Sequence, residues 1–76
     1  MSLQQQFAAE GVEWRRYEYD DRVEFVADFG PHGRSSADVV GDTVIVVADG
    51  EQYEFDIAAD ARASMTNGVL TIEVSK

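Results

Sequence analysis

The stretch TVIVVADGEQYEFDI, residues 43–57, contains the pattern that decides the fold. Its first part, Thr43–Ala48, is rich in β-branched residues and apolar on both faces, which is typical of a strand covered on both sides. Asp49-Gly50 follows, and both residues tolerate the positive φ of a two-residue hairpin turn. Polar and apolar residues then alternate to the end of the stretch. The residues predicted to point inward are Tyr53, Phe55 and Ile57. The stretch therefore predicts two antiparallel strands.

The same period of two is found nearer the N-terminus. Residues alternate from Val12 to Tyr19 and again from Arg22 to Phe29, and Asp20-Asp21 separates the two runs. Two alternating runs joined by a short polar turn indicate a second antiparallel pair. The sequence Gly30-Pro31-His32-Gly33 ends this pattern, because proline lacks a backbone donor and glycine permits positive φ.

The remaining segments give weaker signals. Arg34–Asp38 is predicted to be a polar connector or an edge segment, before a turn at Gly41-Asp42. Ala58–Thr66 is predicted to be irregular. Asn67-Gly68 is a second strong hairpin signal, and Val69–Val74 is predicted to close the chain as a strand.

Residues 1–11 differ from the rest because their spacing is helical. Ser2 and Gln5 have the spacing of a capping box, and Leu3 and Phe7 fall on one helix face. So short a helix is not stable alone. We therefore expect this segment either to pack through its two apolar residues or to fray.

Taken together, these signals predict an all-β fold. Six or seven short antiparallel strands separated by turns are typical of a β-sandwich, here over residues 12–76, preceded by a short N-terminal helix. A chain of 76 residues allows one such domain.

The composition excludes several classes of site. The chain has no cysteine, which excludes disulfides, thiolate zinc sites and cysteine nucleophiles, and one histidine cannot form a multi-histidine metal site. No apolar run approaches the length of a membrane span, and no signal-peptide pattern is present. We therefore expect a cytoplasmic protein.

The charge balance bears on partners. Six basic and fifteen acidic residues give a net charge of −9, and the chain has a single lysine, Lys76. Nucleic acids and anionic membranes are recognised through clustered lysine and arginine, so neither is expected as a partner. The composition resembles that of proteins from salt-accumulating halophilic archaea. In about 1 M salt the Debye length falls to roughly 3 Å, which would screen the repulsion among the carboxylates.

The sequence offers no convincing catalytic, cofactor or metal site. His32 lacks a neighbouring nucleophile and an orienting partner, so we interpret it as an exposed loop residue rather than a general base. The carboxylates lack the spacing of a calcium-binding loop and are interpreted as solvated surface charge. Gly30 and Gly33 fit no phosphate-binding fingerprint. We therefore expect no enzyme activity, in preference to a small hydrolase or isomerase.

Three aromatic residues, Trp14, Tyr17 and Tyr19, allow two interpretations. They could stack on single-stranded nucleic acid, but that mode of binding requires a cationic groove beside them. Packing in the core or against a neighbouring strand is the interpretation that we favour.

The final segment, ASMTNGVLTIEVSK at residues 63–76, resembles the signature strand of the small heat-shock protein (alpha-crystallin) family. Ser75 stands where that family usually has proline. Three upstream segments also resemble strands of that family, although their motifs are less specific: 16–29, 37–46 and 53–57. The matching residues of the final segment are Ala63, Asn67, Gly68, Val69, Leu70, Thr71, Ile72 and Lys76.

Departures from that family limit what the resemblance implies. Residues 48–52 are too few to form the long loop that the family's dimers exchange, and the family's C-terminal docking tail is not found before Lys76. The layout is more similar to the related CS-domain co-chaperones. We therefore expect a monomer or weak dimer, not a large oligomer.

The resemblance implies an ATP-independent chaperone-like or co-chaperone module that binds unfolded or extended polypeptide, or one dedicated partner, at a sheet edge or groove. The groove would lie between the strands at 43–48 and 69–74, although both faces of the first strand could instead be covered within the fold. The candidate groove residues are Val44, Val46, Ala48, Val69, Thr71 and Glu73. The alternative function is an acidic adaptor or nucleic-acid mimic that binds one basic partner without chaperone activity.

Overall fold

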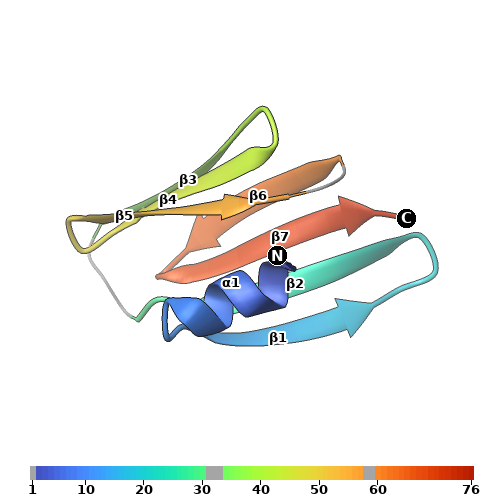
Figure 1. Ribbon diagram of the computed structural model, residues 1–76, viewed down its shortest axis with the longest axis horizontal. Coiled ribbons are helices and arrows are strands. Elements are labelled where there is room, and N and C mark those ends of the chain that lie inside the picture. The colour runs from blue at the N-terminus through green and yellow to red at the C-terminus, as the bar shows by residue number, and fades with distance from the viewer. Residues whose placement is uncertain (1, 31–33, 58–59) are drawn as a thin grey trace.

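The computed structural model describes residues 2–30, 34–57 and 60–76, and this part of the chain forms one helix and seven strands (Figure 1). In chain order the elements are α1 (Leu3–Ala9), β1 (Glu13–Glu18), β2 (Arg22–Asp28), β3 (Ser35–Val40), β4 (Thr43–Ala48), β5 (Glu51–Asp56), β6 (Ala61–Thr66) and β7 (Val69–Ser75). No helix within these ranges has the length and hydropathy that a membrane crossing requires.

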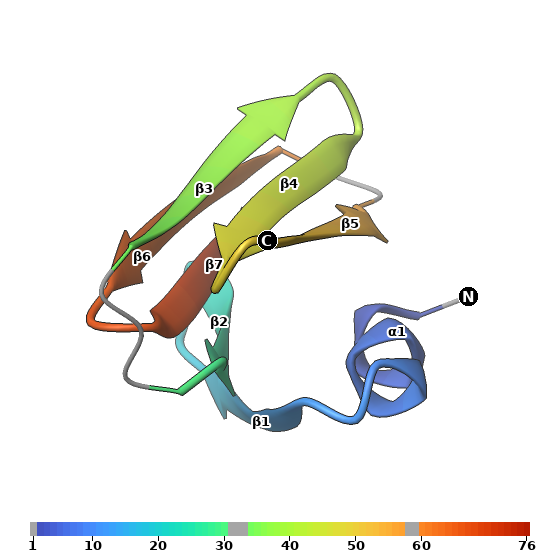
Figure 2. The same cartoon turned by 90° about the vertical axis from the view of Figure 1, so that its left-hand side faces the viewer.

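The strands form two antiparallel sheets that face each other. One sheet has the order β1-β2-β7-β6 and the other β3-β4-β5. Figure 2 views this arrangement nearly end-on, with the two layers meeting where β3 lies beside β6. On the opposite side α1 contacts both β1 and β5 and fills the space between the layers. The predicted all-β sandwich is confirmed.

Each sheet contributes alternate residues to one core. Phe25, Leu70 and Ile72 point inward from the four-stranded sheet, and Val44, Val46 and Phe55 point inward from the other. This follows from the period-two geometry of strands, which places every second side chain on one face. The inward orientation predicted for Tyr53, Phe55 and Ile57 is therefore confirmed.

Helix α1 is part of this core. Phe7 is fully buried and its ring meets that of Phe55 edge to face, with the centroids 4.9 Å apart. The predicted capping box is present, since Ser2 Oγ accepts from the Gln5 N–H and Gln5 Oε1 accepts from the Ser2 N–H. The segment therefore packs rather than frays, and Leu3 also lies against the core.

The hairpin turns occur where the sequence predicts them. Asp49 and Gly50 have φ of 52° and 77°, and Asn67 and Gly68 have φ of 51° and 80°. Two consecutive residues with positive φ match the right-handed twist of the flanking strands, which is why these dipeptides are strong signals.

One of the two weakly predicted segments differs from expectation. The predicted irregular stretch 58–66 contains β6, whose inward residues are the small or flexible Ala61, Ala63 and Met65. Such residues have low strand propensity, so pairing with β7 decides the conformation instead. The segment 34–38, predicted to be a polar connector or an edge segment, mostly belongs to β3, which is an edge strand, so the second alternative is correct. His32, Pro31 and Ala58 lie outside the described residues.

Strand β4 also differs from expectation, because only one of its faces is covered. Val44, Val46 and Ala48 are buried, whereas Val47 is 39% exposed and Ile45 is half-buried. The three-stranded sheet has no layer on its outer side in the described part of the chain (Figure 2). The prediction of a strand covered on both sides is therefore wrong.

Candidate polypeptide-binding edge

The six predicted groove residues do not form one groove. Val44, Val46 and Ala48 of β4 are 0–2% exposed and belong to the core. Val69, Thr71 and Glu73 of β7 alternate with the buried Leu70 and Ile72, so they point to the outer face of the other sheet. The sandwich separates the two sets, because β4 and β7 lie in different layers. The predicted groove is corrected accordingly.

The outer edge of β1 is a row of backbone groups with no described strand beside it. The Tyr19 N–H donates to the Arg22 carbonyl at 2.8 Å, which sets the phase of the β1–β2 ladder. Bonded and non-bonded pairs alternate in an antiparallel ladder. Trp14, Arg16 and Glu18 therefore direct their N–H and C=O groups away from β2. All six residues of β1 are exposed.

The outer edge of β5 is different, because a side chain of α1 occupies it. Gln6 Nε2 donates to the Asp56 carbonyl at 2.9 Å, and Gln6 Oε1 accepts from the Asp56 N–H at 2.7 Å. One primary amide thus pairs with both backbone groups of one edge residue, as a neighbouring strand would. Gln6 is 50 residues away in sequence, and nothing in the local pattern indicates this contact.

The remaining two edges, of β3 and β6, lie side by side at the other corner of the sandwich. Within β3 the Val39 N–H donates to the Asp38 carboxylate at 2.9 Å, so it is not available to another strand. Charged side chains that bond the edge backbone are a common way to prevent unwanted strand pairing. Among the described edge strands, only β1 is exposed at every residue.

An open hollow of about 920 Å³ lies beside the start of β1. Its lining includes Val26 and Val69 from the outer face of the four-stranded sheet, and Trp14 and Arg15 from β1. The remaining lining residues are Ala8, Gly11, Val12, Glu13 and Asp28. This hollow and the free edge of β1 are continuous, since they share residues of that strand.

The three aromatic residues near this edge are exposed. Trp14, Tyr17 and Tyr19 are 38%, 44% and 41% exposed, so core packing is wrong for them. Tyr19 does pack against the adjacent strand, because the Arg22 guanidinium lies 4.2 Å from its ring centroid. The sequence pattern could not show whether these aromatic residues are exposed or packed in the core, because β1 has the same alternation as strands with one buried face.

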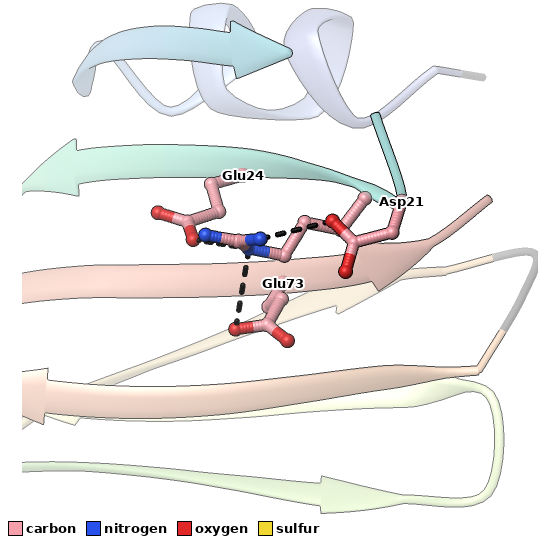
Figure 3. Close-up of polar contacts among 4 residues, drawn as sticks. Asp21, Glu24 and Glu73 are labelled. Carbon is pink, nitrogen blue, oxygen red and sulfur yellow. Dashed lines mark hydrogen bonds and ion pairs between the residues drawn. The ribbon is translucent and has the colours of Figure 1, made fainter. Parts of the chain in front are cut away.

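The arginine in this cluster is held by carboxylates (Figure 3). Arg22 lies 2.9 Å from Asp21 and from Glu24, and 4.0 Å from Glu73 on β7. The hydrogen bond to Glu24 is the main cause that raises the pKa of Arg22 above its ordinary value. These contacts engage Nε and Nη1 of the guanidinium. The three carboxylates around Arg22 would repel a phosphate backbone beside the exposed aromatic residues.

A second set of ion pairs fixes the far end of β1. Lys76 Nζ lies 2.7 Å from Glu18 Oε2, and Arg16 Nη1 lies 3.1 Å from the other carboxylate oxygen. The hydrogen bond from Lys76, with a further contribution from Arg16, lowers the pKa of Glu18. With Glu13 and Arg15, these residues make β1 locally near neutral in a chain of net charge −9.

No group of three histidine, aspartate or glutamate side chains within residues 2–30, 34–57 and 60–76 is arranged to hold a metal ion.

The chain matches DUF7127, a family of unknown function, over residues 1–74. The protein belongs to the DUF7127 family. No curated protein and no solved structure matches the chain significantly. The match spans α1 and nearly all of β7, so the DUF7127 family includes the helix together with the sandwich.

Proposed function

We propose that this protein is an ATP-independent, chaperone-like or co-chaperone module that binds an extended polypeptide by strand addition at the edge of β1. The observation that carries the proposal is the outward backbone of Trp14, Arg16 and Glu18, which pairs with no described strand and lies next to a hollow lined by apolar and charged residues. Strand addition takes its affinity from main-chain hydrogen bonds and its selectivity from pockets for alternate side chains.

The side chains of β1 support this mode of binding. Trp14 and Tyr17 lie on opposite faces of the strand, so a peptide beside β1 would meet an aromatic residue on either face. The balanced charges of β1 would avoid the repulsion that acidic clients meet elsewhere on the molecule. The similarity of residues 63–76 to the small heat-shock protein signature also supports a minimal alpha-crystallin-like or CS-like member. In this protein Asn67-Gly68 forms the hairpin between β6 and β7.

The proposal also concerns the compartment and the salt concentration in which the protein functions. We infer a cytoplasmic, halophilic protein whose partners are polypeptides rather than nucleic acid or membrane. The chain has fifteen carboxylates and only six basic groups, which disfavours binding to polyanions. Molar KCl should raise the melting temperature by screening the repulsion among these carboxylates. A melting temperature that does not change between low and molar KCl would contradict the halophilic part.

The test compares Arg16→Pro with Arg16→Ala. Both variants remove the guanidinium and its ion pair with Glu18, but only proline removes the outward N–H, a change that edge strands tolerate. The chain has a single tryptophan, Trp14, so binding at β1 should shift its emission to shorter wavelength. The ligand is a tryptophan-free peptide of alternating valine and threonine, about ten residues long.

In molar KCl, the unchanged protein and Arg16→Ala should bind the peptide and suppress aggregation of a heat-labile enzyme at near-stoichiometric ratio. Arg16→Pro should bind at least about fivefold more weakly, since one lost hydrogen bond contributes about 1 kcal/mol. Equal binding by the two variants would exclude the β1 edge. Peptide binding without suppression of aggregation would leave a co-chaperone or dedicated-partner role.

A further inference from the structure

The outer face of the three-stranded sheet has an arrangement that the proposed function does not use. Its central column, from β4, is Val47, Ile45 and Thr43, and Val40 of β3 extends it at one end. Val40 is 58% and Val47 39% exposed. Exposed apolar surface rimmed by polar groups is typical of an interaction site.

Carboxylates border this apolar column on both sides. The β3–β4 and β4–β5 registers place Asp38 and Glu54 directly opposite Ile45, one on each side, and Asp56 opposite Thr43. All three are exposed, and none lies within 4.0 Å of a basic group in the described part of the chain. Their nearest polar contacts are internal, since Asp38 accepts from the Val39 N–H and Glu54 from Gln52.

We propose that this face docks an amphipathic helix of a partner protein, with a narrow apolar stripe flanked on both sides by lysine or arginine. A helix laid along β4 would place its stripe over Ile45 and its basic residues beside Asp38 and Glu54. Six strand residues span about 20 Å. That length corresponds to about 13 helical residues. Packing a helix on an uncovered sheet face is a standard way to bury such a surface.

Charge complementarity selects this occupant over a second copy of the chain. Two copies meeting through this face would place like-charged carboxylates close together around Ile45, which is unfavourable. Arg34 is the single basic residue near the face among those described. It lines a small hollow with Ser36 and Val47 at one end of the column, away from the three carboxylates. This proposal is independent of the edge of β1, because the two surfaces belong to different sheets.

The experiment uses a pair of designed helical peptides and a charge exchange. Both peptides carry the same leucine stripe, flanked by lysine in one and by glutamate in the other. The full chain should bind the lysine peptide at least about tenfold more tightly. Asp38→Lys/Glu54→Lys should reverse that preference. Asp20→Lys/Asp60→Lys makes an identical change in net charge away from this face, and should keep the preference for lysine.

Ile45→Thr tests the apolar contribution while retaining a β-branched residue in the strand. It should weaken binding of the lysine peptide at least about threefold in both low and molar KCl. Amide chemical-shift changes should centre on β3, β4 and β5. The proposal is overturned by an unchanged preference in the Asp38→Lys/Glu54→Lys variant, or by shift changes confined to the four-stranded sheet. It is also overturned if the unchanged protein is a dimer that Ile45→Thr dissociates, since a second copy would then occupy the face.

Discussion

The edges of β1 and β5 both lie next to α1, yet the chain pairs only one of them with its own atoms. At β5 the Gln6 amide bonds both backbone groups of Asp56, and Phe7 fixes the helix above Phe55. At β1 the outward groups of Trp14, Arg16 and Glu18 have no such partner among the described residues. The same short helix therefore blocks the Asp56 end of the β5 edge and leaves the edge of β1 accessible.

This difference shows how little sequence is needed to block strand addition. Edge strands invite pairing with other chains, and proteins restrict this with short strands, charges or covering elements. Here the covering element has seven residues, and one side chain makes the backbone contacts. The accessible edge is then a consequence of where α1 packs rather than of any special sequence in β1. Three predictions would break or sharpen this comparison.

The largest effect is expected for Phe7→Ala. Removing this fully buried ring should lower the free energy of unfolding by about 3–5 kcal/mol, a large fraction of the stability of a small domain. Phe7→Leu, which keeps most of the volume, should lower it by only about 1 kcal/mol. Urea denaturation in molar KCl measures both. An unchanged midpoint for Phe7→Ala would mean that α1 is not part of the folded core.

A smaller effect is expected for Gln6→Ala. Loss of two partly exposed hydrogen bonds to Asp56 should lower the free energy of unfolding by about 1–2 kcal/mol. The amide of Asp56 should then exchange with solvent as fast as the outward amide of Arg16. Gln4→Ala is the matched control, because Gln4 lies on the same helix and its side chain makes none of the described hydrogen bonds. Equal exchange rates for Asp56 in the two variants would contradict the edge-blocking role of Gln6.

The smallest effect concerns the ion pair between Glu18 and Lys76. Because the folded-state pKa of Glu18 is lowered, its contribution to stability is present above the unfolded value of about 4.3 and is lost as the pH falls through the folded value. Lys76→Ala should move the pKa of Glu18 upward, and Arg16→Ala should move it less. Carboxyl NMR titration measures these values. If the pKa of Glu18 rose more in Arg16→Ala than in Lys76→Ala, Arg16 rather than Lys76 would be the main cause of its lowered value.

Much of the fold could be predicted because its signals are local. Asp49-Gly50 and Asn67-Gly68 have positive φ, which their own backbone preferences favour, and the alternation of Tyr53, Phe55 and Ile57 indicates which side faces the core. Strand β6 was not predictable in this way. Its inward alanines carry no β-propensity, and only pairing with β7 makes that segment a strand.

The candidate site was predicted less well, and β4 illustrates why. Its run of β-branched residues correctly indicates a strand, but two apolar faces do not reveal which one the molecule covers. The structure buries Val44 and Val46 and leaves Val47 exposed, so the expected groove residues lie in the core. Exposure of Trp14 and Tyr17 was missed for the same reason, since alternation alone does not say whether a second layer reaches over the strand.

The sequence by itself determined the strands, the tight turns, the capped helix and the acidic surface, because each depends on residues that are close together in the chain. The tertiary structure alone decided which face of β4 meets solvent, that Gln6 pairs with Asp56, and that the edge of β1 stays open. These features depend on contacts between residues up to 50 positions apart. The free energy of such contacts comes from packing and hydrogen bonding between elements that are far apart in the chain. The hydrophobic periodicity and backbone propensity of a short segment do not indicate which of these contacts form.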